Sequence, residues 1–126
     1  MPSHIFTRLG LWQESIDSNV VANRAAKTYA EQTYGPGGYD QETVHALDYL
    51  AYAYLQTAQD DAAKGVVDQI AVLRKGATPN LPIAYALAAI PARYVLERRD
   101  WPAAAAFQPA AREFPWDRFP WGRGYD

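Results

Sequence analysis

Residues 45–70 read HALDYLAYAYLQTAQDDAAKGVVDQI, and this stretch decides the fold. Apolar and aromatic residues recur in it at helical spacing on both sides of a break at residues 58–60. They are Leu47, Leu50, Ala51 and Tyr54 before the break, and Ala63, Val67 and Ile70 after it. Two amphipathic helices with a short connection pack as an antiparallel hairpin. The stretch therefore predicts one helix hairpin.

Capping residues and helix breakers predict the neighbouring helix boundaries. Upstream, a helical apolar period begins at Trp12, and that helix should end near Tyr29, before the Gly/Pro-rich loop at residues 35–38. Asp40 is the expected N-cap of the first helix of the hairpin. Gly76, which follows a lysine, is the expected end of its second helix.

Downstream, two further helices are predicted. Asn80 should cap a helix that reaches about Arg98 and is kinked near Pro91. Asp100 should cap a final short helix. Since no segment carries a strand pattern, we expect an all-α fold of about five to six helices arranged in antiparallel hairpins.

Residues 114–126 form an aromatic, Pro-rich tail without a helical period. We expect this tail to be extended or disordered. For Trp116 and Trp121 we favour a role in capping the chain's own end over docking into a partner's groove. The remaining chain, residues 1–113, is expected to form one domain of three units, at about 1–33, 40–76 and 80–113.

Small residues recur at equivalent positions of the three expected hairpins. They are Ser3, Ala51 and Ala92 in the first helices, and Ser15, Ala63 and Ala104 in the second helices. Because a small side chain lets two helices approach closely, these positions should face the neighbouring helices. The spacing predicts hairpins that stack on one another.

This spacing resembles the tetratricopeptide repeat (TPR), W-x2-L-G-x2-Y…A-x3-F, with Leu47 in place of Trp and Ala51 in place of Gly. The stretches MPSHIFTRLGLWQESI, HALDYLAYAYLQ and YALAAIPARYVLERRDW are similar to a group of bacterial TPR proteins. The chain departs from the pattern in its longer units and in Pro2 and Pro91, which replace a leucine. The resemblance implies an α-solenoid, and a chain that is a fragment or a shortened relative of longer proteins. Its uncapped ends should then favour a homodimer.

The resemblance also implies that the first helix of each unit lines a concave groove. The candidate binding residues on those helices are His4, Arg8, His45, Asp48, Tyr52 and Arg93. Arg8 and Arg93 are candidates for anion binding, because the guanidinium fork binds a carboxylate bidentately. We therefore expect a non-catalytic scaffold for a protein or peptide segment. The alternative is that these side chains are only solvated helix surface.

Two further hypotheses remain open for the histidines. His4, His45 and Asp48 suit a two-His-one-carboxylate metal site, and His45 with Asp48 suits acid–base catalysis. Both would make the chain an enzyme. The commoner explanation is a structural hydrogen bond between helices. We assign no catalytic residue, metal or cofactor from the sequence.

Composition narrows the classes of function. A net charge of -2 argues against a nucleic-acid partner, and the chain contains no cysteine for disulfides or thiol chemistry. No apolar run reaches the length of a membrane span, and Arg8 interrupts the run that a signal peptide would need. We expect a cytoplasmic protein with no membrane partner. A purely structural, self-associating repeat segment is the remaining alternative.

Overall fold

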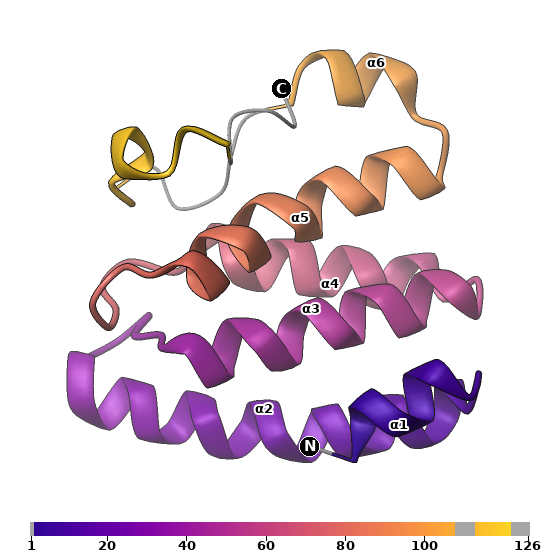
Figure 1. The fold of residues 1–126 in the computed structure, drawn as a ribbon, viewed down its shortest axis with the longest axis horizontal. Helices are drawn as coiled ribbons and strands as arrows, with labels where there is room; N and C mark the ends of the chain where they lie inside the picture. Colours follow the sequence, from indigo (N-terminus) through magenta and orange to yellow (C-terminus); the bar gives the residue numbers. More distant parts are fainter. Residues whose placement is uncertain (1, 108–112, 122–126) are drawn as a thin grey trace.

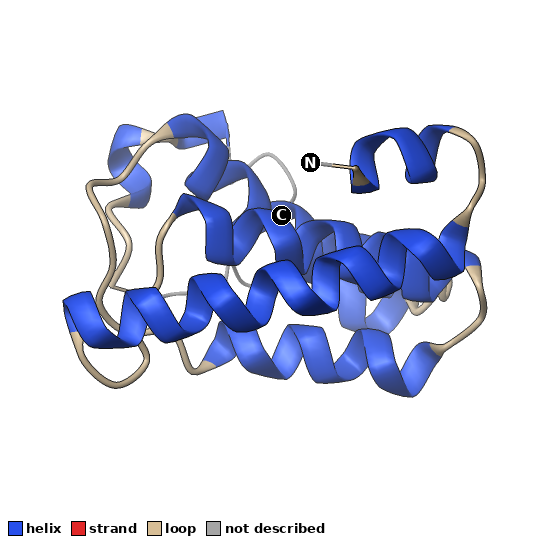
Figure 2. Ribbon diagram, turned by 90° about the horizontal axis from the view of Figure 1, so that it is seen from below, coloured by secondary structure: helices blue, strands red, loops and turns tan. Residues whose placement is uncertain are grey.

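The computed structural model describes residues 2–107 and 113–121 of the 126-residue chain. Helices and loops make up all of this part, and no β-strand occurs in it (Figure 2). The expected all-α class is confirmed. The helices are α1 (Ser3–Arg8), α2 (Trp12–Tyr34), α3 (Gln41–Gln56), α4 (Asp60–Ala71), α5 (Leu81–Glu97) and α6 (Trp101–Ala105), with one turn of 3-10 helix, η1 (Trp116–Arg118).

Consecutive helices pack in pairs, and the pairs follow one another in chain order (Figure 1). α1 packs on α2, α3 on α4, and α5 on α6. Between pairs, α3 packs against both α2 and α5, so that it lies at the centre of the molecule. The core is built mainly from fully buried side chains of α3, α4 and α5, among them Val44, Leu47, Ile70, Ile83, Leu87 and Ile90.

The three predicted N-caps are confirmed. The side chain of Asp40 accepts a hydrogen bond from the Thr43 amide at 2.8 Å. Asn80 does the same for the Ile83 amide at 3.0 Å, and Asp100 for the amide three residues later at 3.1 Å. Each bond satisfies an amide that has no partner inside its helix.

The small residues face their neighbours as predicted. Ser3, Ala51 and Ala92 of the first helices are buried, with 0%, 1% and 3% of their surface exposed. Ser15 and Ala63 of the second helices are fully buried. The exception is Ala104, which is half-buried on the short helix α6. Five of the six positions therefore allow close approach between helices.

Two predicted helix ends are wrong. α2 continues to Tyr34 because the backbone first leaves the helical region at Gly35, where φ is 91°. α4 ends at Ala71, well before Gly76. Gly76 instead lies beside Tyr39 in an isolated bridge: the Tyr39 amide donates to the Lys75 carbonyl, and the Ala77 amide donates to the Tyr39 carbonyl.

The tail differs from its prediction where the structure describes it. Phe114 and Trp116 are buried against the main core, and their rings lie 4.8 Å apart. η1 adds a helical turn that the aperiodic sequence did not indicate. Burial of two aromatic rings fixes this segment beside the beginning of α5 (Figure 1). For Trp116 this agrees with the expected capping of the chain's own end, while residues 122–126 of the tail lie outside the described residues.

Candidate functional site

A cavity of about 550 Å³ lies where α1, α3 and α5 meet the tail. α3 supplies most of its polar wall, and α5 supplies most of its apolar wall. The lining residues are Thr7 of α1; His45, Asp48, Tyr49 and Tyr52 of α3; Leu81, Pro82, Tyr85, Ala86 and Arg93 of α5; and Trp121 of the tail. We call this cavity the groove.

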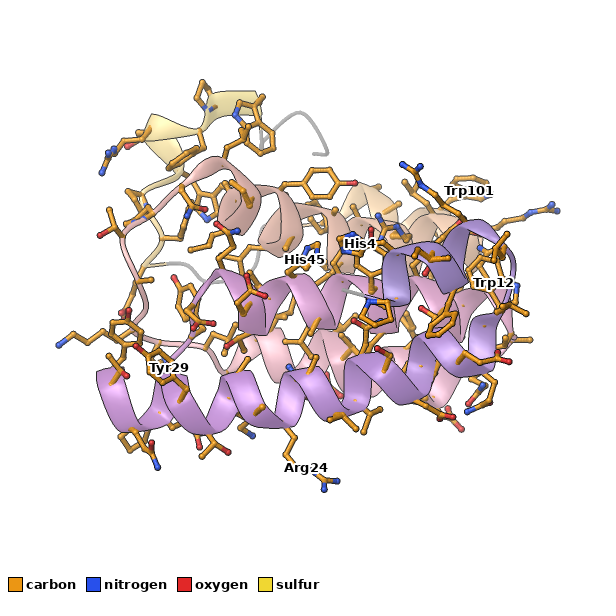
Figure 3. All side chains as sticks on the ribbon, turned by 60° about the horizontal axis from the view of Figure 1, so that its bottom comes forward. His4, Trp12, Arg24, Tyr29, His45 and Trp101 are labelled. Carbon is orange, nitrogen blue, oxygen red and sulfur yellow. The ribbon has the colours of Figure 1, made fainter. Side chains whose placement is uncertain are left out.

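The two histidines of the chain meet at the side of the groove (Figure 3). The Nε2 atoms of His4 and His45 are 2.9 Å apart, and their rings are nearly perpendicular. Because one nitrogen must donate and the other accept, at least one imidazole is neutral in this geometry. The structural hydrogen bond between helices that the sequence favoured is therefore present, and it joins α1 to α3.

Tyr49 holds this pair of imidazoles in position. Its ring stacks on His4 with a centroid distance of 4.7 Å, and it meets His45 edge-on at 5.1 Å. Burial raises the pKa of the Tyr49 hydroxyl, and the negative charge of Asp48 raises it further. Burial also lowers the pKa of His4, with a further contribution from the charge on His45. The surroundings thus favour the neutral forms of Tyr49 and His4.

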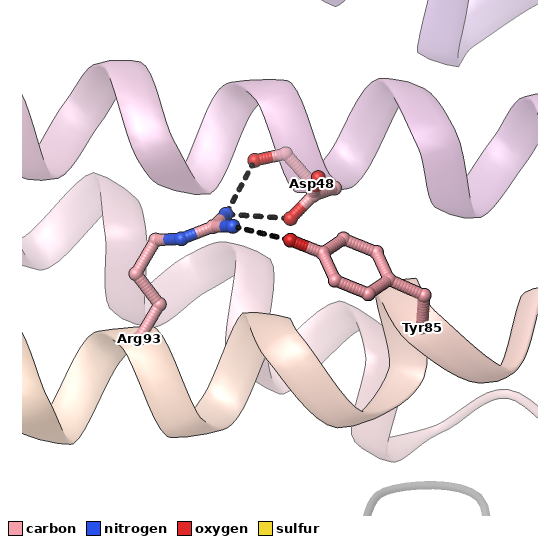
Figure 4. Close-up of polar contacts among 3 residues, drawn as sticks. All are labelled: Asp48, Tyr85 and Arg93. Atoms are coloured by element: carbon pink, nitrogen blue, oxygen red, sulfur yellow. Dashed lines mark hydrogen bonds and ion pairs between the residues drawn. The ribbon is translucent and has the colours of Figure 1, made fainter. Parts of the chain in front are cut away.

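A second polar cluster joins α3 to α5 (Figure 4). Nη1 of Arg93 donates to Oδ1 of Asp48 at 2.5 Å and to the Asp48 carbonyl at 3.5 Å, while Nη2 donates to the Tyr85 hydroxyl at 3.4 Å. Burial opposes the charge of Arg93, but the carboxylate of Asp48 outweighs it and raises the pKa of Arg93. The guanidinium also lies 5.2 Å from the centre of the Tyr52 ring.

The structure brings five of the six predicted site residues together and leaves one apart. His4 and His45 form one contact, and Asp48, Tyr52 and Arg93 form the other. Arg8 is exposed and makes no hydrogen bond or ion pair with the described residues. It nevertheless lies near enough to act on the pKa of Tyr49, which lines the groove.

The hypothesis of a two-His-one-carboxylate metal site does not agree with the structure. Asp48 binds Arg93 of α5, whereas His45 binds His4 of α1. The two side chains of α3 therefore contact different helices. Within the described residues, no group of three or more His, Asp or Glu side chains could hold a metal ion. Arg93, a candidate for anion binding, has Asp48 as its anionic partner in the structure.

Sequence reasoning did not assign Tyr49 or Tyr85 to the groove, and it expected Trp121 to cap the chain's own end, whereas Trp121 lines the groove. Tyr49 follows His45 by four residues, a spacing that places two side chains on the same helix face and could have indicated the contact. Tyr85 is eight residues before Arg93 on α5, again on the same face. No local pattern placed Trp121 at the groove, because its position depends on how the tail folds back.

The described residues thus define an all-α protein of stacked helix pairs with an aromatic, partly charged groove. Comparisons of the chain with protein-family models, with curated proteins and with solved structures found no match. A search of the described helices for one long and apolar enough to span a membrane also found none.

Proposed function

We propose that the chain is a non-catalytic TPR-like scaffold that binds a segment of a protein or peptide partner in the groove. The pairwise packing of its helices supports this assignment, as do the buried small residues at equivalent positions. The first helices of the three pairs, α1, α3 and α5, all contribute to the groove. A stack of such pairs has an inner face that is available to a partner.

The observation that carries the proposal is the size and the lining of the groove. Its volume of about 550 Å³ falls within the range of about 300–1,000 Å³ that is typical of ligand pockets. Tyr49, Tyr52 and Tyr85 supply aromatic surface. The contacts of Asp48 and Arg93 hold the polar wall in place before any ligand arrives, which reduces the ordering cost of binding.

The lining also indicates the kind of segment that fits. Aromatic and apolar walls suit a large apolar or aromatic side chain, and the tyrosine hydroxyls suit a polar group at its end. Arg8 is the exposed cation near this wall, and its guanidinium suits a carboxylate. We therefore expect a segment with an aromatic side chain close to an acidic residue.

Selection from a displayed random peptide library tests the proposal directly. The full chain should enrich peptides with this pattern, whose affinity is then measured by fluorescence anisotropy. Tyr85→Ala should weaken binding about tenfold, and Arg8→Glu several-fold. Their matched controls are Tyr29→Ala and Arg24→Glu, since both residues are exposed on α2 and project away from the histidines (Figure 3). If no peptide is enriched, or if controls and groove variants weaken binding equally, the proposal is wrong.

The enzyme alternative centred on His4, His45 and Asp48 has less support. The carboxylate of Asp48 is bound to Arg93, and within the described residues it accepts no hydrogen bond from either imidazole. The hypothesis of a His45–Asp48 acid–base pair requires this carboxylate to contact and orient the imidazole. We therefore propose no reaction for this site.

Self-association is the second candidate function, and it is favoured by apolar side chains exposed at both ends. Ile5 and Leu9 of α1 are 62% and 67% exposed, and Trp101 at the start of α6 is 61% exposed. We expect a concentration-dependent dimer in sedimentation that Trp101→Glu weakens and Tyr29→Glu does not. A monomer at all concentrations would rule this candidate out.

A further inference from the structure

The contact between His4 and His45 has the features of a two-nitrogen ligand pair. The two histidines are 41 residues apart in sequence and lie on different helices, and their Nε2 atoms are 2.9 Å apart. Both imidazoles are half-buried, so solvent can still reach the site. Tyr49 restrains both rings by stacking and edge contacts. A position between two convergent, restrained imidazole nitrogens can hold either a shared proton or a metal ion.

We propose that His4 and His45 form a binding site for a divalent ion of the zinc, nickel and copper class. Imidazole is a preferred ligand of these ions. Two metal–nitrogen bonds of about 2.0–2.1 Å at a tetrahedral angle place the nitrogens about 3.3 Å apart. The observed 2.9 Å therefore needs to widen by only about 0.4 Å, which small side-chain rotations provide.

Binding needs no net loss of a proton from the pair. In the free protein one imidazole carries its hydrogen on Nε2 and donates it to the other. When the ion binds, that hydrogen moves through solvent to Nδ1 of the same ring. Both Nε2 lone pairs then face the ion. Only a neutral imidazole is a metal ligand, and the hydrogen bond between the two rings already requires at least one of them to be neutral.

The charges around the pair partly offset one another. Arg8 on α1 is a positive charge that opposes a cation, and Glu42 on α3 is a negative charge that favours it; both act on His4. Asp48 is bound to Arg93 and supplies no ligand. Water therefore completes the coordination of the ion. The ion joins α1 to α3, so it should also stabilise the folded state, by an amount that grows with the logarithm of the free-ion concentration once this exceeds Kd.

Titration calorimetry of the full chain with zinc sulfate and with nickel sulfate tests the site. The chain contains two histidines and no cysteine, so no other imidazole and no thiolate competes for the ion. We expect one ion per chain, and at least a tenfold loss of affinity in both His4→Gln and His45→Gln. Asp61→Asn, an exposed carboxylate in the first turn of α4, is the matched control and should leave the affinity unchanged.

A second measurement uses the unmodified chain, so that it still tests the site if the histidine variants fail to fold. Paramagnetic Ni²⁺ should broaden the ring signals of His4, His45 and Tyr49 before any others in the NMR spectrum. Broadening that starts at Asp60 and Asp61 would overturn the proposal. So would a histidine variant that folds, as judged by its circular dichroism, and binds as tightly as the unmodified chain. Neither measurement involves a peptide, so a failure of peptide binding and a failure of metal binding can be told apart, although His45 also lines the groove.

Discussion

α1 and α5 each begin a helix pair, yet different forces hold them in place. Each has a proline followed by a small buried residue, Pro2–Ser3 at the start of α1 and Pro91–Ala92 inside α5. α5 buries eight residues, all of them apolar, whereas α1 buries only Ser3. α1 depends instead on polar bonds, from His4 to His45 and from Thr7 to Ser15.

This difference indicates that α1 is the more weakly held helix. A large apolar side chain buried in α5 contributes about 1.5–3 kcal/mol. A hydrogen bond such as those of α1 contributes about 0.5–1.5 kcal/mol net. Repeated sequence spacing can therefore place two helices in similar positions while leaving one of them much less stable. The following predictions test this comparison.

The largest effect is expected in α5. Leu87 is fully buried, so Leu87→Ala should lower the free energy of unfolding by about 2–5 kcal/mol through lost burial and a cavity. Ile5→Ala on α1 is the contrasting change, and because Ile5 is 62% exposed it should cost less than about 0.5 kcal/mol. Urea denaturation of both variants measures this difference. Equal losses would contradict the comparison.

The contact between α3 and α5 should give the next largest effect. Arg93→Gln leaves Asp48, whose side chain is only 13% exposed, without its cation. We expect a loss of about 1–3 kcal/mol, the usual cost of leaving a largely buried polar group without a partner. The double variant Asp48→Asn/Arg93→Gln should lose less than the sum of the two single variants, as measured in a double-mutant cycle. Additive losses would show that the two side chains are not coupled.

At the start of α1, one substitution should stabilise the protein. The Ser3 hydroxyl is fully buried and has no hydrogen-bond partner among the described residues. Ser3→Ala removes this unpaired group and keeps the small size that the contact needs. We expect a gain of about 0.5–1 kcal/mol in thermal or urea unfolding. A loss would mean that the hydroxyl has a partner in solution.

The smallest effect is a pH dependence that comes from His4. Burial lowers its pKa below the ordinary value of 6.5, so the folded state binds this proton less tightly than the unfolded chain does. Its contribution to stability is therefore complete above pH 6.5 and declines as the pH falls through the folded pKa. Unfolding in the presence of a chelator, followed from pH 7.5 to 5, should show this decline. His4→Gln should reduce its slope, and an unchanged slope would contradict the assignment.

Much of the fold could be predicted because the signals are local. Asp40, Asn80 and Asp100 cap helices through bonds to amides three residues away, which the sequence displays directly. The buried positions of Ala51 and Ala92 follow from helical spacing. The end of α4 could not be predicted in this way, because the residues that follow it are bonded to a distant loop. The Lys75 carbonyl accepts a hydrogen bond from the Tyr39 amide, and the Ala77 amide donates one to the Tyr39 carbonyl.

The sequence predicted most of the residues of the site, but it did not predict which helix each of them contacts. Helix periodicity placed His45 and Asp48 on one side of α3, and each found a partner on a neighbouring helix. Residues three apart are nearly one helical turn from each other, so their side chains point in similar directions. The directions still differ enough for the two side chains to contact different neighbouring helices. Only the packed structure decides that His45 meets α1 and Asp48 meets α5. The same holds for Phe114 and Trp116, whose burial has no periodic signal.

The bridge between Tyr39 and Gly76 brings the entrance and the exit of the central hairpin to one point. A Cβ atom at Gly76 would approach the Tyr39 ring to within 2.6 Å, so the close approach depends on glycine. The connections that precede α3 and follow α4 therefore lie side by side, and the hairpin begins and ends at the same place in the fold. An insertion or a loss of residues within the hairpin would therefore leave the two flanking connections beside each other.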